Sequence, residues 1–211
     1  MRNKLTLAVA FGLALAFTLS CSSENKEDNP SSSSNNSTPS QIVYGDPVSH
    51  GGETYETVVI GTQTWFKRNL NYDVPNNKCY YDEPANCAIY GRLYDWETAK
   101  NVCPLGWHLP SKDEWDVLMN FADNVTKLVA KSGWPVEKTD DYGFSALPGG
   151  HESISFVGVG NGGYWWSATE DSNSAAYGYV FGITARVAAF SGGFTMELGN
   201  YFNSVRCIKD N

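Results

Sequence analysis

The chain has 211 residues, with 15 basic and 23 acidic side chains and a formal net charge of −8. This acidic balance disfavours nucleic acid or an anionic membrane surface as a partner, because both repel a negatively charged protein. The aromatic content of 14%, with seven tryptophans and twelve tyrosines, is typical of a secreted all-β or α+β module.

The first 20 residues have the pattern of an export signal. Arg2 and Lys4 precede an apolar run, residues 5–19, that is too short to span a membrane comfortably. Cys21 follows, so we predict a lipoprotein signal peptide over residues 1–20 and lipidation of Cys21. An ordinary secretory signal is the alternative, but it leaves a cysteine directly after the apolar run unexplained. Acyl chains on Cys21 would anchor the protein in the cell envelope, where we expect it at the outer membrane and exposed at the surface.

Residues 21–48 are predicted to be a flexible tether. Serine, asparagine, proline and acids dominate residues 22–41, which offer no apolar side chain to a core. Without residues 1–20 the chain keeps 13 basic residues against 23 acids, a net charge of about −10. The remainder, residues 49–211, is enough for one domain.

The domain is expected to open with a β-hairpin. Apolar side chains alternate around Tyr55, Val58 and Ile60, and Gly61-Thr62 supplies a turn. Residues 71–91 are predicted to be a loop.

Four cysteines within the domain predict two disulfides, because an exported protein with an even number of cysteines oxidises them in pairs. The cysteines are Cys79, Cys87, Cys103 and Cys207. Three pairings are possible. Cys79–Cys87 would close a short, turn-rich loop easily, which leaves Cys103–Cys207. Chain-entropy arithmetic assigns about 2.6 kcal/mol to the short loop and about 4.8 kcal/mol to the long one.

Two helices are predicted. In residues 92–103, apolar side chains recur on one helical face before Pro104: Leu93, Trp96, Ala99 and Val102. The second helix is expected from Ser111 to Asp123, because Ser111 and Glu114 form a capping box ahead of an apolar stripe. Lys127 to Lys131 could add a further helical turn.

From Gly143 onward, short alternating runs separated by glycines predict antiparallel strands. The runs are residues 143–150, 164–170, 176–190, 193–200 and 204–210. Helices segregated from an antiparallel sheet place the domain in the α+β class.

Six blocks of sequence carry a family resemblance. They are YETVVIGTQTWFKRNL, CYYDEPANCAIYGRLYDWETA, CPLGWHLPSKDEW, YGFSALPGG, GYWWSATE and SVRCIKD. In this order, over about residues 50–210, they resemble the Fibrobacter succinogenes major paralogous domain. That family is similar to the C-type-lectin-like fold, in the branch of the sulfatase-modifying, formylglycine-generating enzymes. The resemblance implies two helices with antiparallel sheets and a bridge from the end of the first helix to the last strand, which would join Cys103 to Cys207.

The residues do not support the activities known for related folds. Formylglycine generation uses a close pair of late cysteine thiols holding copper, whereas the late part of this chain has only Cys207. Glu83-Pro84 resembles part of a lectin calcium site, but Ala85 interrupts the element. The three histidines lack metal-site spacing and no GxSxG motif is present, so we expect no metal, cofactor or catalytic residue. Carboxylate pairs for glycoside hydrolysis remain open, because 23 acids permit many.

The segment CPLGWHLPSKDEWDVL, residues 103–118, concentrates residue types common in active sites. We nevertheless expect structural roles. His108 should donate to a backbone carbonyl, Glu114 should cap the second helix, and Trp96, Trp107 and Trp115 should face the core.

Binding is the favoured function, because exposed aromatic faces beside amides or carboxylates bind sugars. The candidate ligand-binding residues are Tyr81, Trp134, Tyr177, Tyr179, Tyr201 and Asn203. We therefore expect a non-catalytic envelope lipoprotein that binds an extracellular ligand, with plant-fibre polysaccharide as the candidate. The alternatives are a structural or protein-interaction module of the envelope and a divergent enzyme of the formylglycine-generating-enzyme-like fold.

Overall fold

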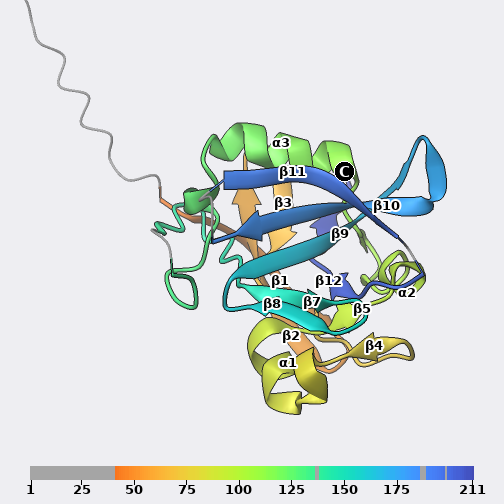
Figure 1. Ribbon diagram of the computed structural model, residues 1–211. Helices are drawn as coiled ribbons and strands as arrows, with labels where there is room; N and C mark the ends of the chain where they lie inside the picture. Colours follow the sequence, from red (N-terminus) through yellow and green to blue (C-terminus); the bar gives the residue numbers. More distant parts are fainter. Residues whose placement is uncertain (1–40, 136–137, 186–188, 198) are drawn as a thin grey trace, which may run out of the picture. The chain divides into compact units, whose positions relative to one another are not determined.

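The computed structural model describes residues 41–135, 138–185, 189–197 and 199–211, which form an α+β domain of two sheets and three α-helices (Figure 1). The predicted signal peptide, Cys21 and most of the predicted tether lie outside these ranges. None of the helices within them is long and apolar enough to cross a membrane.

The first sheet contains the predicted hairpin. Ile60 pairs with Gln63 across the turn at Gly61-Thr62, as expected. The prediction that the tether extends to residue 48 is wrong, because a strand that begins at Val43 pairs with the hairpin. Ile42 and Val48 pack against the core, so burial of apolar side chains resumes before residue 49. The strand order is β1-β2-β3-β13-β6, with bounds Val43–His50, Glu53–Ile60, Gln63–Phe66, Ile208–Lys209 and Trp107–His108.

The second sheet is mixed. Ser204 pairs in parallel with Trp165, and Gly150 with Gly163, whereas the remaining pairs of named strands are antiparallel. The main path is β11-β10-β9-β12-β5-β4: Ala189–Glu197, Ser174–Thr184, Gly162–Asp171, Asn203–Ser204, Leu93–Tyr94 and Asn77–Lys78. A further hairpin is attached to β9, formed by β7 (Gly149–Glu152) and β8 (Phe156–Val159). Residues 176–190 were predicted as a single alternating strand, but they are divided between β10 and β11.

The helices differ from the prediction in number and length. α1 (Pro84–Tyr90) lies in the predicted loop, and α2 is only Trp96–Ala99. The predicted helix over residues 92–103 is shortened because Leu93-Tyr94 forms β5, between β4 and β12. α3 (Lys112–Ala122) has the predicted capping box and ends at Asp123. Short 3-10 turns, η1 (Tyr80–Asp82) and η2 (Val125–Lys127), complete the helical elements of the described residues.

Both predicted disulfides are confirmed. Cys79–Cys87 joins the start of η1 to α1, with 5.0 Å between the Cα atoms. Cys103–Cys207 ties the end of the α2 region to the segment before β13. The first bridge therefore braces a surface loop, whereas the second connects positions that are 104 residues apart in the sequence.

The aromatic side chains form much of the core. Trp115 of α3 stacks on Phe181 of β10, with ring centroids 4.2 Å apart. Trp96 and Trp115 are buried as predicted. Trp107 is half-buried and packs against Phe66. Burial of a large apolar side chain contributes about 1.5–3 kcal/mol, so these contacts carry much of the stability.

A buried arginine organises the centre of the domain. Arg206 is fully buried, and its Nε and Nη2 donate to Asn69 Oδ1 at 3.0 and 2.7 Å. Its Nη1 donates to the carbonyls of Phe66 and Phe144. Trp165 Nε1 donates to the same Asn69 oxygen at 2.7 Å. One amide oxygen therefore accepts three hydrogen bonds and links three distant segments.

Candidate functional site

The predicted ligand-binding residues differ greatly in exposure. Tyr81 is 62% exposed and Tyr177 41%, whereas Tyr179 and Tyr201 are half-buried. Trp134 is buried and donates from Nε1 to the carbonyl of Ala146, so the prediction that it contacts ligand is not supported.

Asn203 is also buried. Its Nδ2 lies 3.6 Å from the sulfur of Met196, within the second sheet. This burial leaves no surface on Asn203 for a ligand. Tyr81 is thus the most exposed of the predicted residues.

Tyr81 belongs to an aromatic group that we call the platform: Tyr80, Tyr81 and Phe156. The ring of Tyr81 lies 4.6 Å from that of Tyr80 and 5.5 Å from that of Phe156, edge to face in both pairs. Tyr80 is buried and Phe156 half-buried, so they support Tyr81 from beneath. The platform joins the disulfide-braced loop to the β7–β8 hairpin.

The backbone under Tyr81 is held in an unusual conformation. Tyr81 and Asp82 have φ values of 58° and 55°, in the left-handed region that costs a non-glycine residue about 1–2 kcal/mol. The turn is fixed by the Cys79–Cys87 bridge and by Asp82 N, which donates to the carbonyl of Cys79. Such strain is often retained at functional sites, where it fixes the direction of a side chain.

The β7–β8 hairpin supplies the other half of the platform. Val159 N donates to the hydroxyl of Tyr80, and the Tyr80 ring lies close to Gly150, where a Cβ atom would be only 2.6 Å away. Phe156 was not among the predicted residues. The alternation of Ile154 and Phe156 beside serines is the signal that could have identified it. Ile154 is fully exposed at the turn of this hairpin.

Polar groups surround the platform. Asp82 and Glu83 are exposed next to Tyr81, and Asn86 donates from Nδ2 to the carbonyl of Tyr80. An exposed aromatic ring with adjacent carboxylates can stack on the apolar face of a sugar while the acids accept bonds from hydroxyl groups. This arrangement is suited to binding a ligand with both apolar faces and hydroxyl groups.

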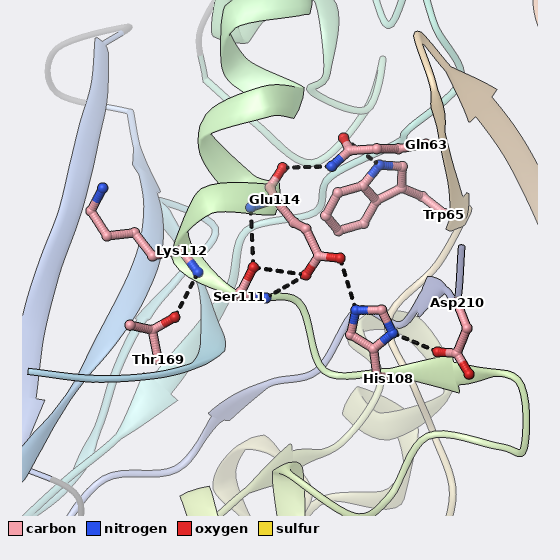
Figure 2. Close-up of polar contacts among 8 residues, drawn as sticks. All are labelled: Gln63, Trp65, His108, Ser111, Lys112, Glu114, Thr169 and Asp210. Carbon is pink, nitrogen blue, oxygen red and sulfur yellow. Dashed lines mark hydrogen bonds and ion pairs between the residues drawn. The ribbon is translucent and has the colours of Figure 1, made fainter.

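In the segment of residues 103–118, His108 makes different contacts from those predicted. His108 does not donate to a backbone carbonyl; its Nδ1 lies 2.6 Å from Asp210 Oδ1 and its Nε2 lies 2.9 Å from Glu114 Oε1 (Figure 2). The prediction was wrong because Asp210 is 102 residues away in the sequence. Burial lowers the pKa of His108, but hydrogen bonds to Asp210 and Glu114 outweigh this effect, and the pKa is raised.

This network anchors the first turn of α3. Both nitrogens of His108 face carboxylates, and the hydroxyl of Ser111 donates to Glu114 Oε2 at 2.9 Å. The first turn of α3 is also attached to both sheets (Figure 2), because Gln63 donates to the carbonyl of Glu114 and Lys112 N donates to Thr169. His108, Ser111 and Glu114 are thus linked in one hydrogen-bond network that includes Asp210.

Within the described ranges, no group of three or more histidine, cysteine, aspartate or glutamate side chains is arranged to hold a metal ion.

Comparison with known protein families identifies the family to which this chain belongs. Residues 58–209 match the model of the Fibrobacter succinogenes major domain, which covers more than half of the chain. No curated protein and no solved structure matches the chain.

Proposed function

We propose, from the premise that the chain belongs to the Fibrobacter succinogenes major domain family, that it is a non-catalytic envelope protein that binds plant-fibre polysaccharide. The observation that carries the proposal is Tyr81, a tyrosine 62% exposed on a disulfide-braced turn and supported by two further aromatic rings.

The chemistry of the platform suits a neutral polysaccharide such as cellulose or xylan. The flat, apolar faces of these sugar rings can stack on Tyr81, while their hydroxyl groups donate to Asp82 and Glu83. A ring that is already oriented loses little conformational entropy on binding, which favours affinity. Water must leave the tyrosine face, and that desolvation adds to the favourable free energy.

The proposal includes a location and a fold. Lipidation of Cys21 would hold the domain at the outer membrane through the tether. Replacing Cys21 with alanine should release the protein from the membrane fraction and abolish labelling by a palmitate analogue. The bridge from Cys103 to Cys207 supports a C-type-lectin-like arrangement, which superposition of an experimental structure on such domains would test.

A pull-down on insoluble cellulose, xylan and pectin tests the function. We expect the purified protein to be retained on cellulose or xylan, and Tyr81→Ala to reduce retention. Tyr44→Ala is the matched control, because Tyr44 is a similarly exposed tyrosine, 56%, on β1 and outside the platform. The proposal would be abandoned if no polysaccharide retained the protein, or if both variants behaved alike. Cross-linking to an envelope protein in cells, without retention on polysaccharide, would favour an interaction module.

A further inference from the structure

A second site is formed by a charged cleft between the β2–β3 hairpin and the segment that follows η2. Its volume is about 580 Å³. Thr54, Glu56, Lys67 and Arg68 line the hairpin side. The opposite side includes Lys131, Asp140 and Ser145. None of these residues belongs to the platform.

The cleft concentrates positive charge in an acidic protein. Three cationic side chains, Lys67, Arg68 and Lys131, line it against two acids. Lys67 pairs with Glu56 at 3.0 Å, and Arg68 pairs with Glu53 at 2.5 Å. Lys131 is exposed and has no ion-pair partner among the described residues. An ammonium group is therefore available to a ligand at the rim of the cleft.

The acid on the opposite wall is already engaged by hydrogen bonds. Asp140 Oδ1 accepts from Ser145 N at 2.8 Å, and Oδ2 accepts from Ser145 Oγ at 2.6 Å. Both residues have positive φ values, 49° and 53°. Behind this wall, the guanidinium of Arg206 is bonded only to amide and carbonyl oxygens. Arg206 also interacts electrostatically with Asp140, so the charge of Asp140 is partly offset by a buried cation.

The wall that carries Lys131 is held in place by hydrogen bonds to Ala146. Val129 pairs with Ala146 in a parallel bridge, and Ala130 N donates to the carbonyl of Ala146 at 2.9 Å. The buried indole of Trp134 donates to that same carbonyl at 2.8 Å. Trp134 thus fixes the wall of the cleft. A preformed cleft requires little ordering when a ligand binds.

We propose that this cleft binds an acidic sugar, with the carboxylate of the sugar on Lys131 and Arg68 and its hydroxyl groups on Ser145, Asp140 and Glu56. A site lined only by cationic side chains would bind any anion. Glu56 and Asp140 can accept hydrogen bonds from hydroxyl groups, which a sugar ring supplies and a phosphate dianion largely lacks. A singly charged carboxylate on a polyhydroxylated ring matches both sets of side chains.

Isothermal titration of the purified protein with trigalacturonate tests this proposal, with maltotriose and inorganic phosphate as comparison ligands. We expect trigalacturonate to bind, the comparison ligands to bind at least tenfold more weakly, and 500 mM NaCl to reduce the affinity. Lys131→Gln should lower the affinity about tenfold, equivalent to about 1.4 kcal/mol. Arg68→Gln should also lower it.

Two variants serve as controls. Lys209→Gln removes an exposed lysine outside the cleft and should bind trigalacturonate like the wild type. Tyr81→Ala should also leave this affinity unchanged, which separates the cleft from the polysaccharide proposal. The proposal is overturned if Lys131→Gln and Arg68→Gln both retain wild-type affinity, or if phosphate or maltotriose binds as tightly as trigalacturonate.

Discussion

Replacing Asn69 with alanine is expected to destabilise the domain strongly. Asn69 Oδ1 accepts from Arg206 Nε, Arg206 Nη2 and Trp165 Nε1 at 3.0, 2.7 and 2.7 Å, and all three residues are buried. Alanine would leave these donors without that acceptor. Removing the partner of a buried charge costs about 3–5 kcal/mol, because the charge stays desolvated. For a domain of this size, about 4 kcal/mol corresponds to a Tm lower by about 8–16 °C.

Urea unfolding of the oxidised protein, followed by tryptophan fluorescence, measures the effect. Asn69→Asp is the matched variant, because it keeps the acceptor oxygen and places a negative charge beside Arg206. It loses the donations from Asn69 Nδ2 to the carbonyl of Tyr90 and to Ser204 Oγ, and it places a carboxylate oxygen against the Tyr90 carbonyl, a smaller cost than loss of the acceptor for Arg206 and Trp165. We therefore expect it to be clearly more stable than Asn69→Ala. A loss below about 1 kcal/mol for alanine, or equal losses for both variants, would refute the reasoning.

Three further predictions concern the site and its supports. His108→Gln should cost more stability at pH 5.5 than at pH 9, because the pKa of His108 is raised on folding. The stabilisation from protonated His108 is complete below the unfolded pKa of about 6.5 and is lost as the pH rises through the folded pKa. Equal losses of unfolding free energy in urea titrations at both pH values would contradict this prediction. Removing the short disulfide in the double variant Cys79→Ser/Cys87→Ser should cost about 2.6 kcal/mol of unfolding free energy and weaken retention on polysaccharide. Unchanged retention would show that polysaccharide binding does not need this disulfide. Gly150→Ala should cost about 1–3 kcal/mol, because its Cβ would lie 2.6 Å from the Tyr80 ring at a φ of +66°, and a wild-type Tm would exclude this contact.

Features encoded by local sequence were predicted well. The capping box at Ser111 depends on a side chain three residues away, and the turn at Gly61 depends on one glycine. The α+β class follows from the change of pattern at Gly143. β5 was missed because Leu93-Tyr94 is a strand only through its pairing with β4 and β12, the latter more than 100 residues later. Helical spacing alone could not reveal that competition.

The site was less predictable, because exposure is a tertiary property. Tyr81 and Trp134 are both aromatic residues beside turn-forming residues, yet one is 62% exposed and the other 4%. Trp134 is buried in a hydrophobic cluster made of several distant segments, and its indole donates to the carbonyl of Ala146. Phe156 reaches Tyr81 only because the β7–β8 hairpin packs on the braced loop. No local pattern specifies that contact.

Titration of the purified protein with cellohexaose and xylohexaose tests the central claim most directly. We predict that at least one hexasaccharide binds, that Tyr81→Ala weakens this binding tenfold or more, equivalent to about 1.4 kcal/mol, and that Tyr44→Ala leaves it unchanged. If neither hexasaccharide binds, or if Tyr81→Ala binds as tightly as the wild type, the platform is not a polysaccharide-binding site.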